Sequence, residues 1–310
     1  MELCFLGTSA GRPIRGRNVT SITLRIKQNS GAFWMFDCGE GTQHQLLHTS
    51  LKLNKLTKLF ITHMHGDHVY GLPGLLSSRS SLGAIEDLDI YGPPGLRQFV
   101  ESNLQLTGTH LNYSLHIFEI EEGVILEDGS VTIETAKLDH RIDCYGYRIV
   151  EHERPGALNV QWLAEIGVPP GPVYGQLKAG MDVTLNDGRV IRSADAVGEP
   201  LPGRVVTILG DTRPCENAVK LSKRADVLIH EATFAHALVD KANEYGHSTA
   251  LQAAQIAKTA EVRKLFITHF SSRYTLEDLI ELEAEARGVF TNTEAAIELK
   301  PYSITYCKGW

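Results

Sequence analysis

Short runs of alternating apolar and polar residues recur along this chain, and they are separated by runs with the spacing of helices. In the N-terminal part, the alternation predicts strands over residues 22–26 and 32–36, followed by a helix over residues 42–51. After residue 70, Gly71-Leu72-Pro73 opens a further helix. This order predicts a sheet whose strands are connected through helices.

The C-terminal part shows the same mixture. Apolar runs predict strands over residues 205–209 and 226–229, and alanine spacing predicts a helix from Ser248 or Thr249 to Ala260. Another helix is predicted to start at Thr275, an N-cap with Asp278 three residues on. Strands mixed with helices in two similar parts favour the α/β (α+β) class, with two sheets stacked face to face and helices outside.

One repeat relates the two parts. The run Lys58-Leu59-Phe60-Ile61-Thr62-His63 recurs letter for letter as Lys264-Leu265-Phe266-Ile267-Thr268-His269. A six-residue identity is very improbable by chance in 310 residues. It predicts two halves, about 1–150 and 194–310, in which equivalent strands each end at a histidine.

A segment rich in glycine and proline lies between the halves. Nine Gly or Pro residues fall between 155 and 180, so only residues 157–166 are expected to form a short helix. The Asp187-Gly188 pair that follows predicts a hairpin over residues 183–191. We interpret residues 151–193 as an inserted flexible arm that projects from a single domain spanning 1–310. The alternative is a long surface connection without a role.

The loop after the first copy of the repeat carries four metal-binding side chains within six residues, His63, His65, Asp67 and His68. Two imidazoles at i and i+2 can hold one metal ion, and the next two side chains can turn toward a second. Such ligands suit zinc, with manganese, cobalt or iron as substitutes. The alternative is a polar loop that happens to be His-rich, but uncoordinated His and Asp gain nothing from crowding at a strand end.

Three further candidate ligands follow strand-like runs elsewhere. His140 follows an alternating run, Asp211 follows the apolar run 205–210, and His269 ends the second repeat. Strand ends at the rim of a sheet are where α/β proteins place their sites. Each residue alone could be a turn or capping residue, but together with the His-rich loop they predict a metal centre.

Composition narrows the class of protein. Hydrophobic residues make up 43% of the chain and charged residues 22%, as in ordinary globular proteins. We expect no membrane span and no signal peptide, because no apolar run reaches ~20 residues and the N-terminus has no basic start. The cysteines are odd in number, scattered and never spaced C-x-x-C, which predicts reduced thiols in a cytosolic protein: Cys4, Cys38, Cys144, Cys215 and Cys307.

The distribution of charge matters more than its sum. The net charge of −7 argues against indiscriminate nucleic-acid binding. Near the N-terminus, however, Arg12, Arg15 and Arg17 form a locally basic stretch. A phosphate-bearing substrate could meet this basic rim on an acidic body, and a merely solvated arginine cluster is the alternative.

These motifs resemble those of a known family. The H-x-H-x-D-H loop with separate downstream His, Asp and His resembles the metallo-β-lactamase superfamily, whose fold is an αβ/βα sandwich. Residues 7–18 resemble the P-x-K/R-x-R-N loop of the ribonuclease Z family, whose members are also called ribonuclease BN. Residues 171–180 resemble the tRNA-gripping arm of that family, and residues 230–233 with 246–249 resemble its catalytic dyad segments. The whole chain resembles a short-form member.

The resemblance implies a role for each site residue. One zinc ion would be held by His63, His65, His140 and Asp211, and a second by Asp67, His68, Asp211 and His269. Asp67 would also accept a proton from water or orient it, and His247, oriented by Glu231, would protonate the leaving oxygen. Asp37 would support a ligand histidine. The implied RNA contacts are Arg12, Arg15, Arg17, Asn18 and Lys178.

The function implied is a zinc-dependent endoribonuclease that removes the 3′ trailer of tRNA precursors by cutting 3′ of the discriminator base. The resemblance also implies a homodimer in which one subunit's arm serves the other's site. Whether exonucleolytic trimming accompanies the single cut stays open at this point, and the cytoplasmic location is the one expected from the cysteines. One alternative is another dinuclear hydrolase of the same fold, namely a small-molecule phosphodiesterase, thioesterase or lactonase. A non-catalytic nucleic-acid-binding or scaffold protein is a second alternative, which the complete ligand set disfavours.

Overall fold

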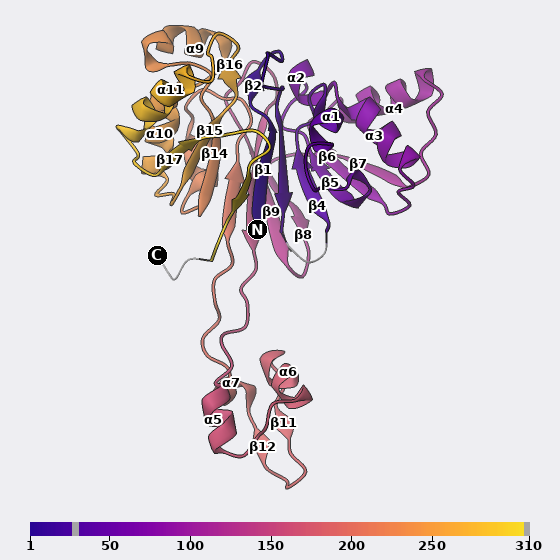
Figure 1. The fold of residues 1–310 in the computed structure, drawn as a ribbon, viewed down its shortest axis with the longest axis vertical. Coiled ribbons are helices and arrows are strands. Elements are labelled where there is room, and N and C mark those ends of the chain that lie inside the picture. Colours follow the sequence, from indigo (N-terminus) through magenta and orange to yellow (C-terminus); the bar gives the residue numbers. More distant parts are fainter. Residues whose placement is uncertain (27–30, 307–310) are drawn as a thin grey trace.

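The computed structural model describes residues 1–26 and 31–306, which form two seven-stranded sheets packed face to face (Figure 1). In the first sheet, four neighbouring strands, β4 to β7, run parallel, and β1, β3 and β18 are antiparallel to their neighbours. The order across this sheet is β18 (Pro301–Ser303), β1 (Glu2–Gly7), β3 (Ser21–Arg25), β4 (Phe33–Phe36), β5 (Leu56–Phe60), β6 (Leu88–Gly92) and β7 (Leu115–Glu119).

The second sheet repeats this design, with a parallel part and an antiparallel part. Its order is β17 (Thr293–Ala295), β15 (Leu265–Thr268), β14 (Val227–Glu231), β13 (Val205–Ile208), β10 (Tyr145–Glu151), β9 (Val131–Lys137) and β8 (Gly123–Glu127). The chain therefore changes sheet between Glu119 and Gly123, and the strands over 123–151 lie in the second sheet, not the first.

Helices cover the outer face of each sheet, so the fold is a four-layer αβ/βα sandwich (Figure 1). The first sheet is covered by α1 (Thr42–Leu46), α3 (Leu72–Ser81) and α4 (Leu96–Leu106), with the short η1 (Leu53–Lys55) and α2 (Gly66–Val69) in the connecting loops. The second is covered by α8 (Glu216–Ser222), α10 (Ala250–Thr259) and α11 (Asp278–Arg287), with η2 (His236–Leu238) and α9 (Val239–Tyr245) beside them.

Aromatic side chains fill the space between the sheets. Phe36, Phe60 and Tyr91 stack across neighbouring strands of the first sheet, with ring centres 4.9 and 5.1 Å apart. From the second sheet, Tyr147 packs edge-on against Phe36 at 5.8 Å, and its hydroxyl donates to the Ile61 carbonyl at 2.5 Å. Aromatic pairs add to the free energy of burial, so this contact fixes how the sheets face each other.

The repeated hexapeptide forms equivalent strands, β5 and β15, in the two sheets. In each copy the phenylalanine, Phe60 or Phe266, faces the core between the sheets. The flanking Leu and Ile of each copy face the helices instead. A strand buried on both faces needs apolar residues on both, which explains the continuous Leu-Phe-Ile run.

Several predicted elements end elsewhere in the structure. The helix predicted over 42–51 stops at Leu46, because the Thr49 hydroxyl donates to the Leu46 carbonyl and accepts from the Leu51 amide. The helix predicted from Thr275 begins at Asp278, although the two residues do exchange hydrogen bonds. The helix predicted from Ser248 or Thr249 to Ala260 is α10, which begins after Thr249 as its N-cap, with Gln252 completing a capping box.

The inserted segment folds into a separate small lobe on two extended connectors (Figure 1). It contains α5 (Val160–Glu165), α6 (Pro172–Lys178), α7 (Ser193–Ala196) and the hairpin β11 (Val183–Thr184) and β12 (Val190–Ile191). The expectation of a single helix here was wrong: α6 forms because Pro172 occupies its first turn, where no amide donor is lost. A small apolar core holds the lobe together, formed by Leu163, Val168, Leu177, Ile191 and Ala196.

The lobe lies at the end of the sandwich opposite the His-rich loop. Its connectors leave from the end of β10 and return at the start of β13, whereas Asp211 follows the other end of β13. Figure 1 shows the lobe below the sheets and α2, β2 (Ser9–Ala10) and β16 (Phe270–Ser271) above them. The arm of a chain is therefore remote from that chain's own candidate site.

The remaining sequence expectations concern thiols and membranes. Cys4, Cys38 and Cys144 are buried free thiols and Cys215 is a half-buried one, while Cys307 lies outside the described residues. None of the helices in the described part of the chain combines the length and apolarity that a bilayer crossing requires.

Candidate metal centre

The candidate ligands converge where the carboxyl ends of β5, β13 and β15 meet between the two sheets. Phe60 ends β5 and leads into the loop with His63 and His65, and the short α2 then presents Asp67 and His68. Asp211 follows β13 and His269 follows β15 directly. Parallel strands bring their carboxyl ends to one edge, so loops far apart in the sequence deliver these side chains to one place.

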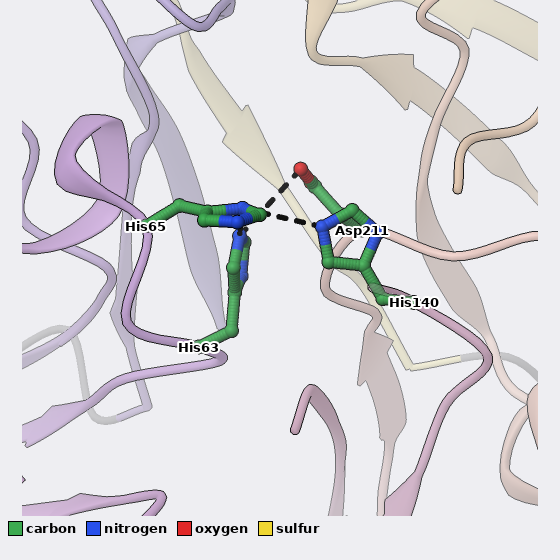
Figure 2. Close-up of side chains that lie close together, drawn as sticks. All are labelled: His63, His65, His140 and Asp211. Carbon is green, nitrogen blue, oxygen red and sulfur yellow. Dashed lines mark hydrogen bonds and ion pairs between the residues drawn. The ribbon is translucent and has the colours of Figure 1, made fainter. Parts of the chain in front are cut away.

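The first group consists of His63, His65, His140 and Asp211, which Figure 2 shows pointing toward one another. His65 Nδ1 lies 3.0 Å from His63 Nε2 and 3.2 Å from His140 Nε2. Asp211 Oδ2 lies 3.7 Å from His63 Nε2. Ligand atoms about 2.0–2.2 Å from one tetrahedral ion are about 3.3–3.6 Å apart, so this group fits a metal ion.

The second group consists of Asp67, His68 and His269. The Nε2 atoms of the two histidines are 3.4 Å apart, and Asp67 Oδ2 lies 3.6 Å from His68 Nε2 and 3.4 Å from His269 Nε2. Asp211 Oδ2 is also 3.6 Å from His68 Nε2 and 3.4 Å from His269 Nε2. Asp211 therefore lies between the two groups, where it can serve both.

Outer hydrogen bonds point one ring nitrogen of each of two histidines at the centre. The His68 Nδ1–H donates to Asp37 Oδ2 at 2.7 Å, and the His140 Nδ1–H donates to the Gly246 carbonyl at 2.7 Å. In both rings Nε2 is left with a lone pair that faces the other ligands. The structure therefore shows Asp37 supporting a candidate ligand histidine.

Two threonines perform the same task for two more of the five candidate ligand histidines, His63 and His269. Thr62 Oγ1 donates to Asp37 Oδ2 at 2.8 Å, so it accepts from His63 Nδ1 at 3.0 Å. Thr233 Oγ1 donates to a Glu231 oxygen at 2.6 Å, so it accepts from His269 Nδ1 at 2.9 Å. Neither threonine was among the site residues predicted from the sequence. The Thr directly before His63 in the repeat was the available signal.

The buried charges of the site favour a cation. Burial would raise the pKa of Asp211, but His269, His68 and His63 hold it well below its ordinary range. Burial also lowers the pKa of His63 well below its ordinary value, and the neighbouring His68 adds to the effect. The neighbouring carboxylates of Asp211, Asp37 and Asp67 in turn raise the pKa of His68 well above its ordinary value, despite its burial. An ionised carboxylate this deeply buried needs positive charge close by, and a divalent metal ion held by these ligands would supply it.

Two site residues adopt the left-handed backbone conformation that non-glycine residues rarely adopt. Asp37 has φ of 58° and His269 has φ of 57°. Such residues are held against a conformational cost of the order of 1–3 kcal/mol each, and they cluster at functional sites. At His269 the conformation turns the chain sharply out of β15, so that the imidazole reaches the second ligand group.

His247 and Glu231 form a dyad beside the ligands. His247 Nδ1 lies 2.9 Å from Glu231 Oε1 and 3.7 Å from Asp211 Oδ2. Burial alone would lower the pKa of His247, but the Glu231 carboxylate reverses this and raises it to about 9. The imidazole is therefore protonated near neutral pH, with Nε2–H free to donate to a substrate.

The N-terminal arginine loop borders the site, but its arginines differ in position. Gly11 donates its amide to Asp67 Oδ2 at 2.7 Å, and Arg12 and Arg15 beside it are exposed. Arg17, in contrast, is only 3% exposed and donates to the Tyr274 carbonyl at 2.6 Å. In this conformation Arg17 holds the loop in place and does not face solvent.

Asn18 and Lys178, the other two predicted RNA contacts, lie far apart. The Asn18 side chain donates to the Glu40 carbonyl at 2.9 Å, so it too secures the loop. Lys178 is exposed on α6 of the arm. The structure thus brings the loop residues beside the candidate ligands, and it places Lys178 at the opposite end of the molecule.

Comparison with known proteins places this site in a family. The chain is 52% identical over 304 residues to a ribonuclease Z of Bacillus licheniformis, which covers 98% of this chain and 99% of the relative. The chain belongs to the ribonuclease Z family. The human tRNase Z short form is a solved structure of the same kind, with a TM-score of 0.71, 30% identity, and coverage of 98% of this chain and 100% of that one.

Two further similarities concern the wider fold. The metallo-β-lactamase fold protein YhfI of Bacillus subtilis covers 97% of this chain and 98% of its own with a TM-score of 0.66 at 21% identity, which confirms the predicted sandwich fold. The profile of the family described as Anti-Pycsar protein Apyc1 matches residues 1–149. Together with the His and Asp clusters, membership of the ribonuclease Z family indicates a divalent metal centre.

The carboxylate of Asp37, which is bonded to His68 from outside the ligand groups, provides a test of the metal centre. Asp37→Asn keeps the volume of the side chain but removes the charge that orients His68. We expect the affinity for zinc to fall about 10- to 100-fold, the usual effect of losing such a partner. Competition with a chelator measures it, and Asp240→Asn, at an exposed aspartate of α9, is the matched control. Equal affinities in the two variants would contradict this role of Asp37.

Proposed function

We propose that this chain is an endoribonuclease that cleaves tRNA precursors directly 3′ of the discriminator base, leaving a 3′-hydroxyl on the tRNA. The observation that carries the proposal is a double ligand group with the His247–Glu231 pair beside it, in a chain 52% identical along nearly its whole length to a ribonuclease Z. We treat residues 1–310 as one domain with the arm, 151–193, inserted. The location proposed is the cytoplasm, because scattered free thiols such as Cys4, Cys38 and Cys144 suit a reducing compartment.

The metal proposed is zinc, two ions per chain. His63, His65, His140 and Asp211 would hold one ion, and Asp67, His68, His269 and the shared Asp211 would hold the other. Such ions supply Lewis-acid stabilisation of a phosphoryl group and lower the pKa of water. The mixture of imidazole and carboxylate ligands suits zinc, and manganese, cobalt or iron could substitute.

Two proton transfers fall to residues of the chain. Asp67 is the most exposed member of the second group, at 11% against 1% for His68 and 3% for His269, and Gly11 fixes its Oδ2 atom, so it would accept a proton from water or orient it. His247 is placed to give a proton to the departing 3′-oxygen, because Glu231 occupies its Nδ1 and leaves Nε2 free. The Thr212 amide donates to Glu231 Oε1 at 3.0 Å, which holds this carboxylate oxygen in position beside His247.

Recognition of RNA is proposed at both ends of the molecule. Arg12 and Arg15 lie exposed beside the ligands and would contact phosphates near the cut. Arg17 and Asn18 would act by holding that loop in place. Lys178 would contact the body of the tRNA from the arm. Local recognition of this kind is compatible with a net charge of −7.

We propose a homodimer in which the arm of one chain grips the tRNA that the other chain cleaves. This follows from the separation of the arm and the site within one chain (Figure 1). An apolar pocket of about 700 Å³ between α1 and α3 offers a surface for the partner, with Leu47 79% and Leu82 60% exposed at its rim. Exposed apolar surface of this kind commonly marks a protein interface.

The decisive test is the choice of substrate. The zinc-loaded protein should cut a trailer-bearing tRNA precursor once, at the discriminator base, and should leave a lactone, a thioester and a β-lactam essentially unreacted. Product lengths on a sequencing gel separate a single cut from stepwise exonucleolytic trimming. A higher kcat/KM for any of the small molecules than for the precursor would refute the proposal.

Removal of the arm should separate binding from chemistry. The Ala157 carbonyl accepts from the Gly198 amide at 3.0 Å, so residues 159–196 can be replaced by a short link. We expect kcat/KM on precursor tRNA to fall about 10²-fold, while hydrolysis of bis(p-nitrophenyl) phosphate is kept, because a remote grip contributes only to a large substrate.

Mixing variants tests whether the arm works between subunits. Chains without the arm should regain activity on precursor tRNA when they are mixed with Asp67→Ala chains, which keep the arm but lack chemistry. Each mixed dimer would then contain one intact site served by one intact arm. No recovery, although mixed dimers are demonstrated by a tag pull-down, would contradict an arm that acts on the partner's site.

The His247–Glu231 pair predicts a loss of rate that depends on whether the leaving group needs a proton. His247→Ala should lower kcat on precursor tRNA about 10²- to 10⁴-fold, the typical contribution of general acid–base catalysis. The deficit should shrink on bis(p-nitrophenyl) phosphate, because p-nitrophenolate leaves without a proton. Zinc content should not change, and His110→Ala, at an exposed histidine remote from the site, is the control. Equal deficits on both substrates would argue that His247 has only a packing role.

A further inference from the structure

The two connectors of the arm meet the body at a buried ion pair. Glu151 is the last residue of β10, and Arg204 directly precedes β13. Arg204 donates from Nη2 to Glu151 Oε1 at 2.8 Å and from Nε to Glu151 Oε2 at 2.9 Å. The side chains are only 7% and 11% exposed. A bidentate arginine–carboxylate pair fixes the relative orientation of the two side chains as well as the distance between them.

An aromatic ring from the other sheet is held against this pair. Tyr306 follows β18, the edge strand of the first sheet, and its ring centre lies 3.2 Å from Arg154 Cζ and 3.9 Å from Arg204 Cζ. Its hydroxyl lies 2.9 Å from both Arg204 Nη2 and Glu151 Oε1. Guanidinium groups stack favourably on aromatic faces, so the ring connects the incoming and outgoing connectors.

The segment that carries Tyr306 is itself fixed to the body. The Ile304 amide donates to the Met1 carbonyl at 2.9 Å, and the Ile304 carbonyl accepts from Arg204 Nη1 at 2.9 Å. The cluster Glu151–Arg154–Arg204–Tyr306 therefore joins the root of the arm to both sheets. It lies at the end of the sandwich opposite the metal centre, so none of its side chains touches the reacting groups.

The connectors lie close together at this root, and nearer the lobe they are joined again where the Gly198 amide donates to the Ala157 carbonyl at 3.0 Å and the Asn159 amide to the Ala196 carbonyl at 2.8 Å. Arg154 and Leu201 exchange backbone hydrogen bonds of 2.9 and 2.8 Å. A Cβ on Gly203 would lie 1.8 Å from the Glu151 carbonyl oxygen, so only glycine permits this approach. Six extended residues span about 20 Å, so a tilt of about 10° at the root displaces the lobe by about 3–4 Å. Small changes at the root thus become large changes at the lobe.

We propose that the cluster of Glu151, Arg154, Arg204 and Tyr306 is a positioning device that sets the direction in which the arm leaves the body. The inference rests on the proposed function, since it assumes that the arm grips the tRNA. Arg154 and Tyr306 are positioning residues in this sense: they act on the substrate only through the arm. Their loss should therefore weaken binding of a large substrate without slowing the chemical step.

Tyr306→Ala, with Tyr306→Phe as its matched control, tests the cluster. We expect Tyr306→Ala to raise KM for precursor tRNA about tenfold, which corresponds to about 1.4 kcal/mol, with kcat unchanged within about twofold. Tyr306→Phe keeps the ring between the guanidiniums and should stay near the wild-type KM. Both variants should hydrolyse bis(p-nitrophenyl) phosphate at the wild-type rate. Equal losses on both substrates, or an unchanged KM for Tyr306→Ala, would overturn the proposal.

Small-angle X-ray scattering without RNA gives a readout that does not depend on tRNA activity. Tyr306→Ala should broaden the distribution of interatomic distances at its long end, and the wild type and Tyr306→Phe should share one narrower distribution. Identical curves for all three would refute the positioning role even if tRNA processing is confirmed. If the wild type fails on tRNA but the curves differ as expected, the proposed function fails and the positioning role stands.

A second variant covers the case in which Tyr306→Ala does not fold. Arg154→Lys keeps the positive charge but loses the planar group that stacks on Tyr306. It should raise KM for precursor tRNA in the same direction as Tyr306→Ala and leave the melting temperature within a few degrees of the wild type. A wild-type KM in this variant would count against the cluster.

Discussion

The structure is organised around one buried carboxylate, Asp211. Its Oδ2 atom lies 3.4–3.7 Å from ring nitrogens of His63, His68 and His269, which come from both sheets. A charged group of this kind is tolerated inside a protein only when partners surround it on every side. The ends of β5, β13 and β15 must therefore meet at one point. Gly210 permits this approach, because a Cβ there would lie 2.7 Å from the Thr62 side chain.

A second layer of hydrogen bonds orients the histidines that surround Asp211. Asp37 and Thr62 orient His68 and His63 from the first sheet, and Thr233 orients His269 from the second. Each bond fixes a tautomer, so the free nitrogens face the centre. The same network includes Glu231, which is bonded to both Thr233 and His247. The candidate metal ligands and the proposed proton donor thus belong to one connected set of buried polar groups.

The arm proposed to recognise tRNA lies apart from this centre. The chemistry lies at one end of the sandwich, and the arm with its own small core leaves from the other (Figure 1). An insertion at strand ends remote from the site leaves the buried network undisturbed, because none of the site's hydrogen bonds passes through it. Under the proposed function, an acidic protein would need positive charge only locally, at the exposed Arg12 and Arg15 and at Lys178 on the lobe.

The sequence by itself identified much of this protein, because ligand chemistry is a property of residue types at short spacing. The H-x-H-x-D-H loop and the hexapeptide repeat predicted the metal loop and the two equivalent strands, β5 and β15. His140, Asp211 and His269 could be proposed from their positions after apolar runs. Only the tertiary structure decided that Asp211 faces both groups, that Arg17 is buried against the Tyr274 carbonyl, and that β8 to β10 belong to the second sheet. Each of these depends on contacts between residues dozens to hundreds of positions apart, and local periodicity carries no information about such contacts.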